Sequence, residues 1–519
     1  MKLAMTGTLA TFDPDPSRAV LDQGTVWIDG DTIAAVTAAG EHRPPGFADV
    51  DPVVTGATIY PGLIDLHNHL AYDFLPVWRA PRDTPYGTRY QWPNAATYGR
   101  DISNPAQAMG IAAAAATLRY AEVKAAVGGV TAIQGSPPLT RAFPGWMVRN
   151  VEKEKGGVGR PRQPIYQSVL EATPAALRKY AGRMDKGSSF AYHLAEGVDP
   201  ALLEEFKLLD DNGCVNDHLI GIHSTALTRK ELKRWGKRGG AVVWSPFSNL
   251  WLYGGTTNVL AAREAGLRVC LGSDWGPSGT RNVLGELKVA SLWNDTHLDG
   301  ALTPSDLTEM VTSAPGDSLA LAWGRSVGRL VAGALADVAV FAGRHADVHE
   351  NLLHATERDV RLVVVGGRAV YGSRTLVTRT SPPGTVAETL QVAGLSRTVV
   401  MRLPEELWPD APDLVAQANL SWADGLARME AVRADPFRAV TEARRRTRDG
   451  VEPLRFVPDM PRPGGGTETT RELTDDELRE LVIEPLDPLA HDAGFFNRIE
   501  RLAPDHAKVL DGLRARFKR

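Results

Sequence analysis

The sequence predicts an α/β fold: a (β/α)8 barrel of the TIM type, a discontinuous small β-sandwich domain and a mostly helical C-terminal extension. Three observations lead to this prediction. The chain has 519 residues, which is too long for one ordinary domain. Between residues 57 and 327, strand-like apolar runs alternate with helical ones, as in a parallel sheet that closes into a barrel. Short strands separated by Gly, Asp and Pro turns lie on both sides of that region.

The β-sandwich is expected in two parts, residues 1–56 and 328–378, with the barrel, residues 57–327, inserted between them. In the first part, strands are predicted at 9–12, 24–28 and 32–36, separated by turns such as Asp29-Gly30-Asp31. In the second part, strands are predicted within 328–341 and at 360–365. The extension, residues 379–519, has mostly helical patterns, including 421–433, a capping box from Thr474 to Glu477 and a Pro/Gly-rich linker at 458–466.

Within the barrel region, the alternation gives a predicted order of elements. An apolar strand ends in Leu66-His67-Asn68-His69, and a long insertion and an Ala-rich helix over 104–127 follow it. Thr303-Pro304 is typical of a helix start and predicts a helix to about Ser313. Further strands are predicted at 130–134, 146–152, 164–170, 188–194, 219–222, 241–244 and 268–272, and further helices near 199–210, 228–236 and 256–265.

The composition is that of a globular protein without an obvious charged partner. Hydrophobic residues make up 43% and charged residues 23% of the chain, and the net charge is -4, so neither nucleic acid nor an anionic membrane is an expected partner. The two cysteines, Cys214 and Cys270, form no Cys-x-x-Cys pair and predict buried thiols rather than a disulfide. No apolar run has the character of a signal peptide or a membrane span, so a cytoplasmic location is expected.

Polar residues follow the predicted barrel strands at the points where those strands end. His67 and His69 follow the first strand, His193 and Glu196 the fifth, His223 the sixth and Asp274 the eighth. Taken alone, the His67-x-His69 pair favours two hydrogen-bonded core histidines over metal ligands. In an α/β barrel, however, the C-terminal strand ends converge on one site. Three imidazoles and a carboxylate would suit Zn²⁺ and also Fe²⁺ or Mn²⁺.

These motifs resemble those of the amidohydrolase superfamily, in the branch that contains triazine chlorohydrolases, methylthioadenosine deaminase and guanine deaminase. The matching stretches occur in family order, and the resemblance covers roughly residues 1–378. They are Pro61-Gly62-Leu63-Ile64-Asp65-Leu66-His67-Asn68-His69, His193-x-x-Glu196, His223 and Ser273-Asp274. The resemblance implies one divalent metal ion, first choice Zn²⁺, bound by His67, His69, His193 and Asp274.

The resemblance also implies roles for the remaining polar residues. Glu196 would transfer a proton to the ring nitrogen or leaving group of the substrate, and His223 would orient the substrate or stabilise charge. Asp274 would also accept a proton from the attacking water. No lysine that could be carbamylated to bridge a second metal follows the predicted fourth strand, which favours a mononuclear site. Members of this superfamily are often dimers, so a homodimer is the assembly that the resemblance implies.

Two further segments are candidate substrate contacts. Ser248-Asn249-Leu250 resembles a Ser-Asn-Leu segment of the same branch, although both polar residues are also common in loops. The insertion after the first strand is rich in aromatic residues and arginines, and an arginine there could bind a carboxylate. Packing of this insertion onto the barrel or onto a second subunit is the alternative. The candidates in the insertion are Trp78, Arg79, Tyr90 and Trp92.

The expected activity is hydrolysis of a non-peptide C–N bond in a small molecule, first of all deamination of a heterocycle by a metal-activated water. A cyclic amide hydrolase similar to imidazolonepropionase is the second expectation, and the two differ in whether ammonia is released. A third hypothesis, from another class, is a catalytically silent barrel that acts as a binding or scaffold protein. The substrate itself depends on the shapes of loops and is not predicted.

Overall fold

The computed structural model describes most of the chain. The described residues are 1–82, 84–143, 145–153, 163–168, 172–402, 417–448, 453–458, 481–486, 489, 492–502, 510 and 512–518. Most of the linker predicted at 458–466 and the capping box predicted at Thr474 to Glu477 lie outside these residues.

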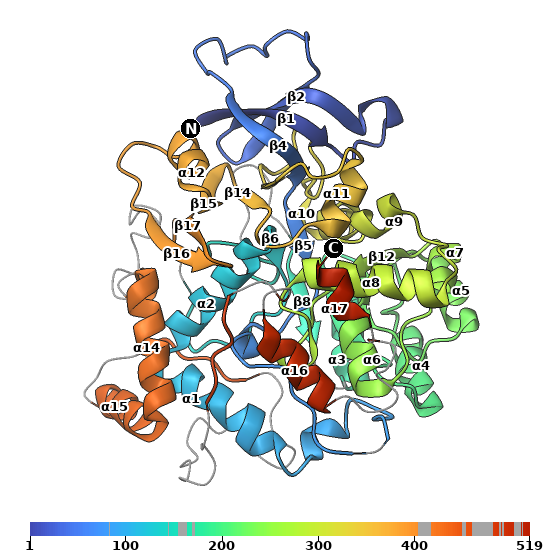
Figure 1. The fold of residues 1–519 in the computed structure, drawn as a ribbon. Coiled ribbons are helices and arrows are strands. Elements are labelled where there is room, and N and C mark those ends of the chain that lie inside the picture. The colour runs from blue at the N-terminus through green and yellow to red at the C-terminus, as the bar shows by residue number, and fades with distance from the viewer. Residues whose placement is uncertain are drawn as a thin grey trace.

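The N-terminal strands and the strands between residues 338 and 399 lie in one sheet, which runs from β1, β2 and β4 at the top of Figure 1 to β17 and β16 at its left. Among the described residues this sheet has nine strands, in the order β16-β17-β15-β14-β13-β4-β1-β2-β3. Their bounds are β1 (Lys2–Ala10), β2 (Val20–Asp29), β3 (Thr32–Thr37), β4 (Val53–Pro61), β13 (Val338–Phe341), β14 (Val360–Val365), β15 (Arg368–Gly372), β16 (Glu388–Val392) and β17 (Leu395–Val399).

The predicted pairing between the two parts of the β unit is present in this sheet. It forms where β13 runs antiparallel to β4, with Ala339 opposite Tyr60. The prediction was of a sandwich, whereas hydrogen bonds join all nine of these described strands into one continuous sheet. β16 and β17 lie in the segment predicted to be mostly helical and extend the sheet because β17 pairs with β15.

Two smaller sheets contain the strands expected for the barrel. Within the described ranges, one has the order β5-β6-β7 and the other the order β12-β11-β10-β9-β8, and the strands in both are parallel. Their bounds are β5 (Leu63–Asp65), β6 (Val130–Ile133), β7 (Arg149–Asn150), β8 (Ile165–Ser168), β9 (Ser189–Leu194), β10 (Leu219–His223), β11 (Ala241–Trp244) and β12 (Arg268–Leu271). The strand predicted at 146–152 is much shorter, because only Arg149 and Asn150 pair with β6.

The chain just after β5 lies against the chain just after β12. The Leu66 amide donates to the Leu271 carbonyl at 3.3 Å, and the Asp274 amide donates to the His67 carbonyl at 2.8 Å. Gly272 permits this close approach, since a Cβ atom there would lie 2.5 Å from His67 Cβ. The contact brings the first His motif beside the Asp274 motif, about 200 residues apart in sequence.

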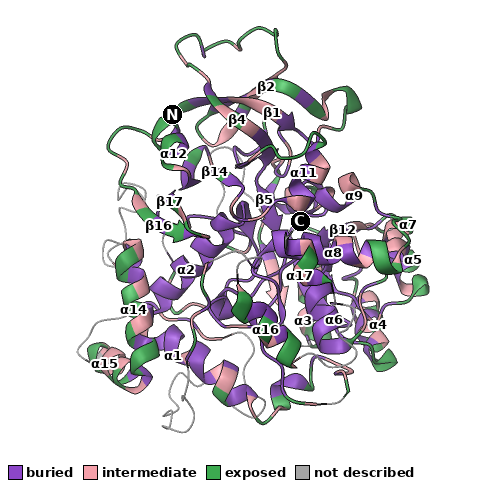
Figure 2. Ribbon diagram, in the orientation of Figure 1, coloured by how far each residue is buried: buried purple, intermediate pink, exposed green. Residues whose placement is uncertain are grey.

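Helices cover the parallel sheets, and their inward faces are buried (Figure 2). The Ala-rich helix predicted at 104–127 is divided at Ala113, and the helix predicted from Thr303 ends earlier, at Glu309. The bounds are α1 (Asn104–Ala112), α2 (Ala114–Val127), α3 (Pro174–Met184), α4 (Leu203–Asp211), α5 (Arg229–Gly236), α6 (Pro246–Tyr253), α7 (Val259–Glu264), α8 (Val283–His297), α9 (Pro304–Glu309), α10 (Ser313–Trp323), α11 (Val348–His354), α12 (Arg374–Thr380), α14 (Trp422–Ala434), α15 (Pro436–Arg448), α16 (Ala493–Leu502) and α17 (Leu513–Lys518).

The C-terminal helices pack on the outside of the core helices. Trp422 at the start of α14 stacks on Tyr120 of α2 with ring centroids 6.1 Å apart. Phe495 of α16 contacts Phe247 of α6, with centroids 5.9 Å apart, and Lys288 of α8 lies 5.6 Å from the ring centroid of Phe517 in α17. In Figure 1, α16 accordingly lies beside α6, and α17 overlaps α8. No helix in the described part of the chain is long and apolar enough to cross a membrane.

Candidate metal centre and active site

The predicted metal ligands meet at the C-terminal ends of the parallel strands. Nε2 of His67 lies 2.8 Å from Oδ1 of Asp274, and Nε2 of His69 lies 3.7 Å from the same oxygen. Nε2 of His193, from β9, lies 3.3 Å from Nε2 of His69. A tetrahedral ion with bonds of about 2.0–2.1 Å holds its ligand atoms about 3.3 Å apart. These separations fit such an ion.

The hydrogen bond on the far side of the His67 ring leaves Nε2 free to bind a metal. Nδ1 of His67 lies 2.9 Å from Oε1 of Gln134, which only accepts hydrogen bonds, so Nδ1 carries the hydrogen. Nε2 of His67 is buried and has no hydrogen-bond partner among the residues that the structure describes. Gln134 is held in turn by Glu152 Oε1 at 2.5 Å and Gln167 Oε1 at 2.8 Å. Such a chain from carboxylate to ligand fixes the ring orientation that a metal requires.

Gln134→Ala is expected to lower the affinity for a divalent metal by about 10- to 100-fold, because His67 loses the group that fixes its ring orientation. Competition with a fluorescent zinc chelator measures this affinity. Gln91→Ala is the matched control, since the Gln91 side chain accepts from the Gly87 amide at the protein surface. Equal affinity in Gln134→Ala and the wild type would contradict this role of Gln134.

A buried contact between Asp65 and Ser273 links the two chain segments that carry His67 and Asp274. Oδ1 of Asp65 accepts from the Ser273 amide at 2.9 Å, and the Ser273 hydroxyl donates to Oδ2. The Asn68 side chain donates to Ser273 Oγ at 3.0 Å. Burial raises the pKa of Asp65 to about 7, although the hydrogen bonds from Ser273 oppose this. These contacts fix the positions of the His67 and Asp274 side chains relative to each other.

His223 lies in the same cluster, but its hydrogen bonds differ from those of His67. The donor atoms of His67, His193 and His223 lie within 4.8 Å of one another. Nδ1 of His223 is 3.1 Å from Nδ2 of Asn249, whose Oδ1 faces the hydroxyls of Thr256 and Thr257 at 3.4 Å. Because the amide nitrogen donates, Nδ1 of His223 accepts and its Nε2 carries the hydrogen. His223 therefore presents a hydrogen-bond donor at this position.

Glu196 faces the cluster from the end of β9. Its Oε2 lies 3.7 Å from Nε2 of His223, and its Oε1 accepts from the Tyr253 hydroxyl at 2.5 Å. The Arg89 amide donates to the Glu196 carbonyl at 3.1 Å, and the Arg89 guanidinium donates to the His193 carbonyl. The insertion after β5 thus holds the segment from His193 to Glu196 in place.

Burial and neighbouring charges act differently on the two carboxyls of the site. Burial raises the pKa of Glu196, with the Arg89 charge opposing it. Burial would also raise the pKa of Asp274, but the adjacent His223 and His67 outweigh it and hold that pKa well below its usual value. Burial lowers the pKa of His223 to about 3, so the imidazole is neutral at physiological pH. The site therefore pairs a firmly ionised carboxylate with one that can take up a proton more readily.

The backbone is strained at the strand ends that carry this cluster. Ala195, His223, Ser224 and Asp274 have φ values of 49°, 64°, 53° and 60°. Non-glycine residues adopt this left-handed region only at a cost of about 1–3 kcal/mol each, and such residues concentrate at functional sites. The strain is consistent with selection for side-chain placement over backbone stability here.

The predicted substrate contacts have different surroundings. Trp92 stacks on Trp275, with centroids 4.8 Å apart, and Trp78 meets the same ring edge-on at 6.1 Å. The Arg79 guanidinium is buried, donates to the Thr84 carbonyl and lies over Tyr86.

Tyr90 is 42% exposed, and its hydroxyl bonds to Glu205 and Arg89. Of the other two, Asn249 contacts His223, whereas the Ser248 hydroxyl pairs with Ser278 at 2.9 Å. Their contacts with a substrate stay a prediction.

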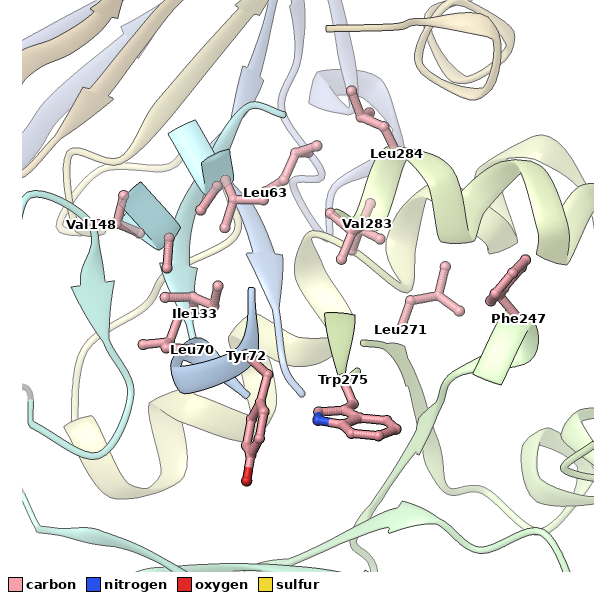
Figure 3. Packing of buried hydrophobic residues seen from close by; sticks show 14 of the residues in the cluster. Leu63, Leu70, Tyr72, Ile133, Val148, Phe247, Leu271, Trp275, Val283 and Leu284 are labelled. Carbon is pink, nitrogen blue, oxygen red and sulfur yellow. The ribbon is translucent and has the colours of Figure 1, made fainter. Parts of the chain in front are cut away.

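Four residues of the site were not among the predicted ones. Gln134 and Glu152 support His67, and Tyr253 contacts Glu196. Trp275 follows Asp274 and stacks on Trp92, and these two rings are called the aromatic roof below. Figure 3 shows Trp275 beside Tyr72 next to the strand ends, with centroids 5.8 Å apart. The Trp275 indole N–H is buried, and no described residue accepts a hydrogen bond from it. Gln134 and Glu152 each lie at the end of a predicted strand and Trp275 directly follows Asp274, whereas no sequence signal marks Tyr253.

Fold and site together define an α/β protein with a buried histidine–carboxylate centre at the ends of parallel strands. The Amidohydrolase family model matches residues 175–371. The resemblance to the amidohydrolase superfamily, in its deaminase-like branch, is confirmed by this match and by the deaminase relatives below.

Two relatives are 5-methylthioadenosine/S-adenosylhomocysteine deaminases. The protein from Syntrophobacter fumaroxidans is 34% identical over 179 residues, which are 33% of this chain and 41% of that protein. The protein from Natronomonas pharaonis is 25% identical over 366 residues, 62% of this chain and 82% of that protein. The chain thus spans less than half the length of the first relative.

Two solved structures share the fold. A mutant of atrazine chlorohydrolase from Arthrobacter aurescens TC1, complexed with zinc and atraton, is 18% identical and has a TM-score of 0.58, with 80% of this chain and 100% of that chain covered. Guanine deaminase from E. coli is 17% identical and has a TM-score of 0.53, with 72% of this chain and 100% of that chain covered. At these identities the likeness concerns the fold alone.

Proposed function

We propose that this protein is a metal-dependent hydrolase of non-peptide C–N bonds, and that it deaminates a heterocyclic small molecule. The observation that carries the proposal is the placement of Glu196 and His223 beside the His67–His69–His193–Asp274 donor set. The named activities of the deaminase relatives support the same class of reaction.

One divalent metal ion would be held by His67, His69, His193 and Asp274, with Zn²⁺ the first choice and Fe²⁺ or Mn²⁺ also suited to these ligands. Such an ion lowers the pKa of water and makes it a nucleophile at neutral pH. On β8, Gln167 accepts a hydrogen bond from Gln134, which in turn bonds His67. An amide there supports the expectation of a single ion, because it cannot be carbamylated as a lysine can.

The protein's own groups divide the remaining work. Asp274 and Glu196 would take up the two protons that the attacking water gives up, and Glu196 would deliver a proton to the ring nitrogen or the leaving amine, for which its raised pKa suits it. Nε2–H of His223 donates a hydrogen bond to the substrate near the attacked carbon. The aromatic roof of Trp92 and Trp275 offers a flat apolar surface, and the unpartnered indole N–H of Trp275 suits an acceptor atom on a heterocycle.

We also propose that the two parallel sheets are parts of one closed (β/α)8 barrel spanning residues 57–327. The hydrogen bonds from Leu66 to Leu271 and from Asp274 to His67 support closure between β5 and β12. The helical extension, residues 379–519 apart from the sheet strands β16 and β17, the other domain boundaries and a homodimer are proposals that rest on the sequence alone.

Release of ammonia from a panel of aminopurines, aminopyrimidines, aminotriazines and adenosine derivatives tests the proposed activity. The zinc-loaded protein is expected to release ammonia from at least one of them and to form the corresponding oxo compound. Ring opening of lactams without release of ammonia would show that the protein is a cyclic amide hydrolase and not a deaminase. Activity on neither group would favour the silent barrel.

A further inference from the structure

Tyr253, at the end of α6, lies in contact with Glu196. It is 1% exposed, and its hydroxyl is 2.5 Å from Glu196 Oε1. Nε1 of Trp92, from the insertion after β5, lies 3.1 Å from the same hydroxyl. The hydroxyl therefore joins three segments far apart in sequence at one point, directly behind the carboxyl proposed to carry the proton.

The direction of these hydrogen bonds follows from the chemistry of the groups. An indole N–H can only donate, so the Tyr253 oxygen accepts from Trp92. The Tyr253 O–H is then directed to Glu196, whose oxygen accepts it. Burial and the neighbouring Glu196 carboxyl raise the pKa of Tyr253 well above its usual value, so the hydroxyl keeps its proton.

This arrangement leaves Glu196 one orientation. With Oε1 bound to Tyr253, the other oxygen, Oε2, faces Nε2 of His223 at 3.7 Å and so faces the reaction centre. The Glu196 backbone is fixed separately, by the Arg89 amide. Among the described residues, Tyr253 is the hydrogen-bond partner of Glu196 Oε1, so its loss would leave that oxygen without one.

We propose that Tyr253 is a positioning residue for the reaction: it fixes the Glu196 carboxylate with Oε2 toward the substrate, and Trp92 holds the Tyr253 hydroxyl for this task. The proposal rests on the proposed function of Glu196. A preorganised proton carrier avoids the loss of rate that comes from reorienting during each turnover.

Steady-state kinetics of Tyr253→Phe, at constant zinc, tests the proposal. A hydrogen bond to a charged group corresponds to about a 10- to 100-fold change in rate, and kcat is expected to fall by that factor while KM and bound zinc stay at wild-type values. Tyr60→Phe is the matched control: Tyr60 is also buried and its hydroxyl donates to the Val348 carbonyl, away from Glu196. The control is expected to retain the wild-type kcat.

Trp92→Phe tests whether Trp92 acts through its hydrogen bond to Tyr253 or only through packing, because the substitution removes the indole N–H and keeps an aromatic ring. It is expected to lower kcat less than Tyr253→Phe, and the double variant is expected to be no slower than Tyr253→Phe alone. If the two losses of kcat multiply in the double variant, Trp92 does not act through Tyr253. A change confined to KM or to thermal stability would also contradict the positioning role.

Crystal structures of the zinc-loaded wild type and Tyr253→Phe provide a test that needs no turnover. In the wild type one Glu196 orientation is expected, with Oε1 on Tyr253, whereas in the variant the carboxylate is expected to rotate away. An unchanged carboxylate in Tyr253→Phe would overturn the inference even if the enzyme is active. If the wild type is inactive but the Glu196 carboxylate rotates in Tyr253→Phe, the proposed function is wrong and the positioning of Glu196 by Tyr253 still holds.

Discussion

Replacing His67 and His69 together by alanine is expected to leave the purified protein without its divalent metal and without hydrolytic activity. The two imidazoles supply half of the proposed ligands, and both rings are directed at Asp274 Oδ1. A site that keeps only His193 and Asp274 should not retain an ion through purification. Elemental analysis is expected to change from about one equivalent of metal per wild-type chain to none.

The control for this experiment is His218→Ala. His218 is only partly buried and its ring contacts Ser189, so its loss should leave the metal content unchanged. Two equivalents in the wild type would contradict the mononuclear site. Metal retained by the double alanine variant would contradict the ligand set itself.

Glu196→Gln is expected to lower kcat by about 10²- to 10⁴-fold, the usual contribution of a positioned acid–base group. Glutamine keeps the size of the side chain and can still accept from Tyr253, but it cannot carry a proton between water and substrate. Bound zinc is expected to be unchanged, because Glu196 is not among the proposed ligands. Steady-state kinetics and elemental analysis on the same preparation measure both quantities.

Glu264→Gln provides the control for Glu196→Gln. Glu264 pairs with Arg229 on the surface, where both side chains are more than half exposed, and its loss should not change the rate. A Glu196→Gln variant with wild-type kcat would remove Glu196 from the reaction. A variant that has lost its zinc would instead indicate that Glu196 supports the metal centre.

The convergence of the polar strand ends could be predicted because each signal is local. His67, His193, His223 and Asp274 each follow an apolar run rich in β-formers, and parallel strands bring such positions to one edge. The runs at β9, β10, β11 and β12 were correct to within one or two residues for the same reason.

The supporting residues could not be predicted, because their roles depend on contacts between distant segments. Tyr253 is 57 residues from Glu196 and 161 residues from Trp92 in the sequence. No local sequence pattern indicates contacts over such separations. The break at Ala113 was missed since alanines on both sides favour a continuous helix. The pairing of β17 with β15 was missed because the segment after residue 379 was dominated by helical patterns.

Hydrolysis in water labelled with heavy oxygen tests the central claim most directly, by comparing zinc-loaded wild type with Glu196→Gln on a substrate that releases ammonia. One labelled oxygen is expected in the product for each ammonia that the wild type releases, and the variant is expected to give the same label at a much slower rate. Ammonia released without label in the product, or at equal rates by the two proteins, would contradict a hydrolytic deamination in which Glu196 carries the proton.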